Sequence, residues 1–277
     1  PRADVVEEYL TSMLSPSGRH LCGLVGRVIF PKSPDVWHEA TRMSGITLAF
    51  DWPDGIFPRD QVPWGVTASL CLWREHAVEF DVRYAKTGGG EDVDFCLRVS
   101  QQAGLKWGKA SSAVVEHPFW ERQPGATGLA RYLGHFFKWT QGDGLLLDRY
   151  PEHVYVNIPN VIELTLPVLF ACGVRAVCVL WAVELAAEGV AAWMGDNARH
   201  LRTSDRACAA LLSGLVKNVV DLGHAVYFLR RGRFEMCIGR RFDWFCGVTD
   251  DVKVGERRKF AFRSLAWMAA IWVARRA

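Results

Sequence analysis

An apolar run of twenty residues constrains this chain more than any other feature of its sequence. The run, "LTLPVLFACGVRAVCVLWAV", covers residues 164–183 and contains one charged residue, Arg175. A helix rises about 1.5 Å per residue, so this run would cross a hydrocarbon core of about 30 Å. A soluble domain with buried helices is the alternative. We favour a membrane span, because basic clusters flank the apolar segment that follows.

Two more apolar segments lie downstream. Residues 208–229 carry Lys217, Asp221 and His224, so they can span a membrane only if these three side chains face a partner helix. Basic residues flank this segment at both ends, which leaves its orientation open. Residues 265–273 are too short for a span on their own. We therefore expect residues 161–277 to form the helical region of an integral, multi-pass membrane protein, with the lipid bilayer as a partner.

Residues 121–160 are expected to connect this region to the first part of the chain. Their sequence "GLARYLGHFFKWTQGDG" places five apolar residues on one side of a helix and interleaves them with basic residues. Such a stripe usually packs in a core. An amphipathic helix at the membrane surface is the alternative, and we assign this interfacial role to the connector.

The first 120 residues alternate between helical and strand patterns. Helices are predicted over residues 5–14 and from the acidic loop at 91 to near Gly104, and strands over 21–30, 65–73 and 111–117. This alternation predicts an α/β layer with its site on loops beyond the strand ends. Because two of these strands are apolar in the manner of strands covered on both faces, we expect an incomplete sheet with one edge or face bare.

The acidic loop itself, "TGGGEDVDFCLRV", places three glycines before three carboxylates. It is not a phosphate-binding loop, because no Lys follows the glycines. It is not an EF-hand, because Cys and Leu occupy the positions of the next oxygen ligand and of Gly. A helix start remains, since acidic residues in a first turn complement the helix dipole. Asp94 and Arg98, four residues apart, can simply pair. This interpretation accounts for Asp94, and less well for Glu91 and Asp92.

Composition narrows the class of protein. Hydrophobic residues make up 50% of the chain and charged residues 23%, so neither a disordered chain nor a nucleic-acid-binding tail is indicated, and no nucleic-acid partner is expected. The eight cysteines form no Cys-x-x-Cys pair and mostly lie in apolar sequence, which favours buried thiols over a zinc site or a disulfide framework. With neither a starting Met nor a signal peptide, the chain is expected to be a fragment of a longer protein.

Four segments in the first 120 residues occur in an order that resembles a known family. They are "WGVTASLCLWREHAVEFDVRY", "GGGEDVDFCLRV", "AGLKWG" and "SSAVVEHPF". A strand with small residues precedes Arg74 and the Phe80-Asp81 pair, a Gly-Gly-Glu-Asp segment follows, and a strand ends in His117 about twenty-five residues after Asp92. The series resembles the acceptor-side half of a family 2 glycosyltransferase with the GT-A fold.

The resemblance implies a fold and a reaction. Residues 1–120 would be the C-terminal half of a GT-A domain, a partial Rossmann-like α/β domain, followed by the helical and transmembrane region. Family members move a sugar from a nucleotide-sugar donor to an acceptor hydroxyl and invert the anomeric carbon. The acceptor would be a glycan, a lipid or a protein. The nucleotide-binding half, with its metal-holding Asp-x-Asp, would precede this chain, so activity is expected of the full-length parent.

The resemblance also assigns roles to individual residues. Asp92 would be the general base that takes the proton from the acceptor hydroxyl, and Glu91 would orient the acceptor or Asp92. On the acceptor side, Trp64 would stack on a sugar face, with core packing as the alternative, and Gly89 and Gly90 would let the loop approach the acceptor closely.

His117 is the candidate metal residue in this chain. The resemblance places it near the diphosphate and its Mg²⁺ or Mn²⁺, as a ligand, whereas a capped strand-end histidine is the alternative. Asp92-Val93-Asp94 does not replace the missing metal motif, because it opens a helix and the metal motif ends a strand. Of the Gln-x-x-Arg-Trp motif of processive synthases only Arg131 is present, so transfer of one or a few sugars is expected.

Two other hypotheses belong to different classes of protein. The chain would be a catalytically inactive glycosyltransferase-like partner or scaffold in a membrane, or a helical membrane protein whose first domain matches the family by accident. An upstream Asp-x-Asp would separate an enzyme from an inactive relative.

Overall fold

The computed structural model describes residues 4–54, 61–195, 200–248 and 251–276. The chain forms two compact units, of α/β and mainly helical structure. Unit 1 contains Pro1–Lys32 and Ile46–Glu121, and unit 2 contains Ser33–Gly45 and Arg122–Ala277. Unit 1 therefore ends where the sequence changes character, but it excludes the segment that carries helix α2 (Val36–Met43).

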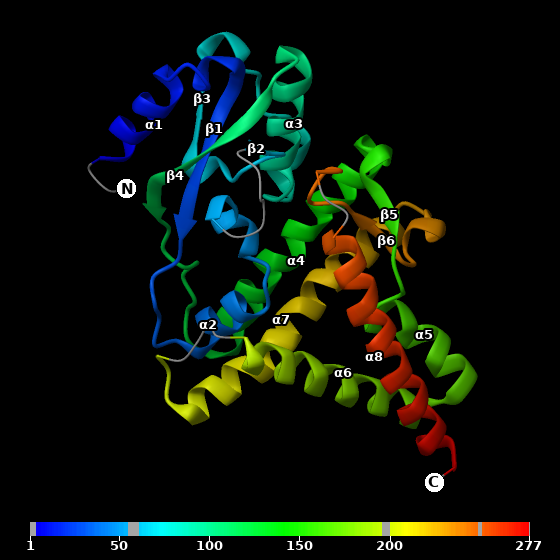
Figure 1. Cartoon of the computed structure of the whole chain (residues 1–277). Coiled ribbons are helices and arrows are strands. Elements are labelled where there is room, and N and C mark those ends of the chain that lie inside the picture. The colour runs from blue at the N-terminus through cyan, green and yellow to red at the C-terminus, as the bar shows by residue number, and fades with distance from the viewer. Residues whose placement is uncertain (1–3, 55–60, 196–199, 249–250, 277) are drawn as a thin grey trace. The chain divides into compact units, whose positions relative to one another are not determined.

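Unit 1 is built on a four-stranded mixed sheet with the order β2-β4-β1-β3 (Figure 1). The central strands β1 (Leu21–Ile29) and β4 (Lys106–Glu116) are parallel, whereas β2 (Gln61–Val62) and β3 (Leu70–Leu72) are antiparallel to their neighbours. The prediction of β1 is confirmed. The strand predicted over 65–73 is much shorter, because Thr67–Ser69 form a 3-10 turn before it.

Two helices lie on opposite sides of this sheet (Figure 1). Helix α1 (Val5–Leu14) packs through Val5, Tyr9 and Met13 on the sheet, and helix α3 (Glu91–Ala103) ends at Gly104 in a left-handed conformation, with φ of 64°. Both helices have the bounds that the sequence predicts, because an apolar face runs along each one and turn-forming residues follow it, Ser15-Pro16 after α1 and Gly104 after α3.

The sheet is open, with β2 and β3 as its two edge strands. Among the described strands, β3 pairs with β1 alone, which leaves its outer edge unpaired. The adjacent helix α1 turns a second apolar stripe outward, with Val6, Leu10 and Leu14 exposed at 63%, 52% and 57%. The six apolar residues of α1 thus divide into a buried and an exposed stripe, because consecutive residues lie about 100° apart on a helix. The sheet is open, and the expectation that it is incomplete stays a prediction.

Unit 2 is helical apart from a small two-stranded ribbon of β5 (Val154–Val156) and β6 (Arg240–Phe242). Besides α2, its helices are α4 (Gly125–Arg149), α5 (Val161–Cys172), α6 (Val174–Met194), α7 (Thr203–Leu229) and α8 (Asp251–Arg276).

Helix α4 lies within the segment expected to be the connector, and part of it is buried in unit 2. Its Tyr132 and Phe136 are buried, and the Tyr132 hydroxyl lies 2.5 Å from Thr41 Oγ1 of α2. It packs closely on α7, because a Cβ at Gly144 would come within 2.2 Å of the Tyr227 ring. Tyr132 and Phe136 of the α4 stripe are thus core residues, whereas Leu129, Leu133 and Phe137 are half-buried, and the membrane-surface role stays a prediction.

The predicted span at 164–183 is wrong in its bounds. Gly173 adopts φ of 82° and ψ of 177°, which ends α5 and starts α6, so the apolar run is divided between two helices. Only Gly adopts this conformation readily. Two helices of the described chain, α6 and α7, are long and apolar enough to cross a membrane. The predicted segment 208–229 lies within α7, and 265–273 lies within α8.

Charged residues connect the three long helices α6, α7 and α8. Glu188 of α6 accepts a hydrogen bond from Lys217 Nζ of α7 at 2.5 Å and another from Arg263 of α8, which also lies 3.6 Å from Glu184. Lys217 therefore faces a partner helix, which is the condition that the sequence sets for a span at α7. Asp221 and His224, the other two polar residues of that segment, are half-buried.

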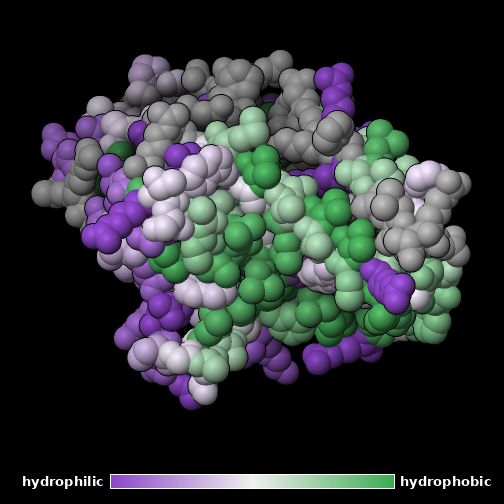
Figure 2. All heavy atoms as spheres, turned by 90° about the horizontal axis from the view of Figure 1, so that it is seen from below, coloured by the Kyte–Doolittle hydropathy of each residue, from purple (hydrophilic) through white to green (hydrophobic). Residues whose placement is uncertain are grey.

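Large apolar side chains remain exposed on these helices. Figure 2 shows apolar residues gathered over a broad area of the face seen from below. On α5 and α8 the exposed residues include Leu166, Phe170, Leu265, Met268 and Trp272. Cys178 and Cys208 are also exposed, so the expectation of buried thiols holds for Cys22, Cys96 and Cys237 and fails for these two.

The break at Gly173 can be tested by substitution. Gly173→Ala should destabilise unit 2 by about 1–3 kcal/mol, because an Ala residue is strained at these backbone angles. Open space surrounds the position, so the added methyl group causes no clash. Gly195→Ala, at the other end of α6, is the matched control: its φ is −66°, so the cost should be within about 0.5 kcal/mol. Thermal unfolding in detergent measures both, and equal losses would show that the α5–α6 break does not depend on Gly173.

Candidate functional site

The candidate site lies at the N-terminus of α3, where the glycine loop delivers three carboxylates. Gly88 and Gly90 have positive φ, of 64° and 85°, so the loop needs Gly at these two positions for its backbone conformation. Gly90 is the residue before the helix, and Glu91, Asp92 and Asp94 fall in the first turn. Their negative charge complements the positive end of the helix dipole, which explains in part why they are tolerated together.

Asp94 belongs to the core and not to the site. Its side chain is fully buried, and Arg98 Nε donates to its Oδ2 at 2.8 Å. The predicted i, i+4 pair is confirmed, but it is a buried pair and not a solvated one. Arg98 is thereby held away from the other two carboxylates.

Asp92 points to a different neighbour. Its Oδ1 accepts a hydrogen bond from the backbone N–H of Thr67 at 3.0 Å, and it forms no ion pair with Arg98 or Lys86. Burial raises the pKa of Asp92, and the Thr67 hydrogen bond opposes this only in part. A half-buried carboxylate with a raised pKa and no cation beside it is a better proton acceptor than an ordinary surface Asp.

Glu91 lies beside Asp92 and is incompletely satisfied. Its Oε2 is buried and has no hydrogen-bond partner among the described residues. Burial raises the pKa of Glu91, and the charge of Asp92 raises it further. Two adjacent carboxylates with raised pKa values are typical of sites where one group moves a proton and the other helps to position it.

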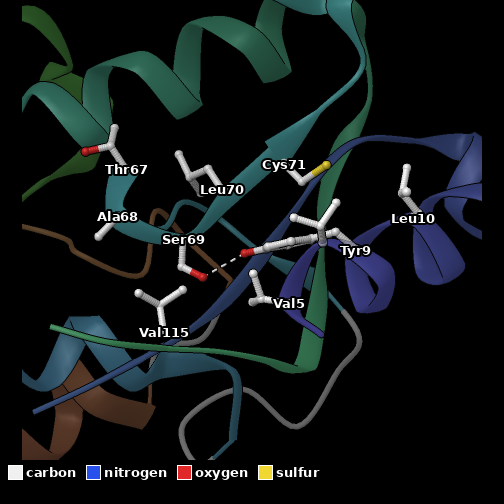
Figure 3. Close-up of a pocket in the computed structure, with 10 residues that line it drawn as sticks. Val5, Tyr9, Leu10, Thr67, Ala68, Ser69, Leu70, Cys71 and Val115 are labelled. Atoms are coloured by element: carbon white, nitrogen blue, oxygen red, sulfur yellow. Dashed lines mark hydrogen bonds between the residues drawn. The ribbon is translucent and has the colours of Figure 1, made fainter. Parts of the chain in front are cut away.

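Thr67, which donates to Asp92, also lines a groove of about 430 Å³ between β3 and α1 (Figure 3). Thr67, Ala68 and Ser69 line it from the turn before β3, and α1 lines it from across the groove. The Tyr9 hydroxyl lies 2.7 Å from Ser69 Oγ, and burial raises the pKa of Tyr9. Sequence reasoning did not find Thr67, Ser69 and Tyr9; the run of small residues at 67–69 is their only signal.

The acceptor-side roles predicted for Trp64, Gly89 and Gly90 stay predictions. Trp64 is 4% exposed, so it has the position of a core residue and no free face for a sugar. Gly89 is buried and Gly90 half-buried, within the loop itself.

His117 lies in an aromatic cluster at the end of β4. Its ring contacts Phe30, Phe50 and Trp120, its Nδ1 lies 2.6 Å from the Pro118 carbonyl oxygen, and it makes no hydrogen bond or ion pair with Glu91. Across the described ranges, no three His, Cys, Asp or Glu side chains are grouped so that they could hold a metal. The metal role of His117 stays a prediction.

Comparison with known proteins gives no match: no family model, no curated protein and no solved structure is similar to this chain.

The two aspartates should respond differently to loss of charge. Asp94→Asn breaks a buried ion pair and should cost about 1–3 kcal/mol of stability, more than an exposed helix pair would. Asp92→Asn keeps an acceptor for Thr67 and should be neutral or stabilising at pH 7. Because the folded-state pKa of Asp92 is raised, any gain should shrink as the pH falls through that pKa and vanish below the unfolded value. Denaturant titrations at several pH values test both, and a larger loss for Asp92→Asn would contradict the assignment.

Proposed function

We propose that this chain is part of a membrane-associated, inverting glycosyltransferase in which Asp92 is the general base. The observation that carries this proposal is the environment of Asp92: its pKa is raised, it accepts hydrogen bonding from Thr67, and it forms no ion pair with any described residue. The order of motifs in residues 1–120, which resembles family 2 glycosyltransferases, supplies the reaction.

The proposed step is a single displacement. The acceptor hydroxyl oxygen bonds to the anomeric carbon of the donor sugar, the bond from that carbon to the diphosphate oxygen breaks, and the nucleoside diphosphate leaves with the electron pair. Asp92 takes the hydroxyl proton as the new bond forms. Glu91, one residue away, keeps the acceptor or Asp92 in place. The described residues do not by themselves fit a Mg²⁺ or Mn²⁺ site, so their role ends with the acceptor and its proton.

Membrane association is supported by the two long apolar helices of unit 2. Only 22% of the apolar window of α6 is buried within the fold, which is unlike the mostly buried core helix of a soluble domain. The charged side chain of Lys217 is paired inside the bundle, as membrane-embedded charges require. The proposal is of an integral membrane protein with α6 and α7 as its spans.

Substitution of Asp92 tests the transferase proposal. In the longest natural chain that contains these residues, Asp92→Asn should lower sugar transfer by about 10²- to 10⁴-fold and leave donor binding nearly unchanged, because the proton acceptor is lost and the shape is kept. Transfer of labelled sugar from a panel of nucleotide sugars is the measurement.

Glu7→Gln is the matched control, since Glu7 is an exposed carboxylate in the first turn of α1. It should leave transfer within about twofold of the parent. Equal and mild effects of the two substitutions would mean that Asp92 only caps a helix. A parent that transfers no sugar would favour the alternative of an inactive partner or scaffold.

Extraction of expressed chain from membranes tests the other half of the proposal. If α6 and α7 span, the chain should resist alkaline carbonate and dissolve only in detergent, because two helices of 21 and 27 residues are held by the hydrophobic effect and not by charge. Release by carbonate as a soluble monomer would rule the spans out.

A further inference from the structure

A second groove, of about 760 Å³, lies in unit 2 between the segment that enters α5 and the first turns of α8. Its walls are largely apolar: Val156, Ile158, Pro159, Val254 and Ala261. Val156 is 53% and Val254 is 42% exposed, so these side chains face solvent in the protein alone. Apolar surface of this kind marks a place where another molecule binds.

Two arginines stand in the same groove. Arg257 donates from one guanidinium nitrogen to the Val156 carbonyl oxygen at 3.3 Å, which holds it at the wall and leaves most of its five N–H groups for another acceptor. Arg258 is exposed and makes no hydrogen bond or ion pair with the described part of the chain. No acidic residue is among the described residues that line the groove. An anion is therefore the complementary partner.

The groove continues as an apolar stripe along α8. Ala261, Leu265, Met268 and Trp272 follow Arg258 at intervals of three or four residues, which places them on one side of the helix. Leu265, Met268 and Trp272 are exposed at 62%, 58% and 55%. From Arg258 to Trp272 the helix rises about 21 Å, more than the depth of one leaflet of a hydrocarbon core of about 30 Å.

We propose that this groove and stripe bind an anionic membrane lipid. Its head-group phosphate accepts hydrogen bonds from Arg257 and Arg258, and an acyl chain lies along Ala261, Leu265 and Met268. A free phosphate would use the arginines and leave the apolar stripe uncovered, and an apolar helix of a second copy would leave two buried guanidinium groups without acceptors. A lipid matches both parts. The inference rests on the proposed membrane association and is independent of sugar transfer.

Lipid retention by the detergent-purified chain tests this inference. The chain is reconstituted in phosphatidylcholine vesicles that contain phosphatidylglycerol, extracted in neutral detergent, and its retained lipid is counted by mass spectrometry. The preference for phosphatidylglycerol over phosphatidylcholine should fall about 10- to 30-fold in the double variant Arg257→Gln, Arg258→Gln, and it should weaken with salt. Ala261→Phe, which fills the groove without a change of charge, should lower retention of the lipid as well.

The double variant Arg230→Gln, Arg231→Gln is the matched control, because it removes the same charge from an exposed pair at the end of α7, outside the groove. It should keep the preference. Four results would overturn the inference. They are an equal loss of lipid preference in the control, equal retention of the two lipids by the unmodified chain, displacement of the bound lipid by inorganic phosphate, and a change of oligomeric state in the groove variant. Should the groove variant fail to fold, Ala261→Phe and the salt series decide. Release of the chain by carbonate would overturn the membrane proposal, whereas loss of lipid preference in a chain that stays in the membrane concerns the groove alone.

Discussion

Helix packing in unit 2 depends on one carboxylate, Glu188, and the two cations that it holds. Lys217 of α7 and Arg263 of α8 both reach it on α6. Removal of such charges from water costs several kcal/mol per ion unless they are paired, so rotation of α7 or α8 away from Glu188 would leave a charge without its partner. The cluster need not add net stability. It fixes which faces of the three helices meet, and the apolar faces that remain are turned outward, toward the proposed bilayer.

The candidate site depends on the helical period in a similar way. Asp92 and Asp94 lie two residues apart, so they point about 200° away from each other on α3. One enters the core of unit 1 and takes Arg98 with it, while the other meets the Thr67 N–H beside the groove. The buried pair thus keeps the only nearby guanidinium of α3 away from Asp92, which is what a general base requires.

Several local features of unit 1 could be predicted from the sequence. The bounds of α1 and α3, the strand β1 and the Asp94–Arg98 pair follow from local periodicity and from Gly104. Much of the site was not. Thr67 reaches Asp92 across 25 positions of sequence, and Ser69 meets Tyr9 across 60, so no local pattern contains either contact. Trp64 likewise had a plausible role at a sugar face, and only the packed sheet shows that it is buried.

The sequence by itself determined the bounds of several helices and strands. Helix propensity and the amphipathic period act over one or two helical turns, so a local stretch of sequence contains them. Tertiary structure decided what those segments do. The run at 164–183 is apolar throughout, yet it becomes two helices because the backbone turns at Gly173. The stripe on α4 has the pattern of a membrane-surface helix, yet its Tyr132 and Phe136 are buried in unit 2. Whether a side chain is exposed depends on neighbours that are distant in sequence, and a local sequence pattern carries no information about those neighbours.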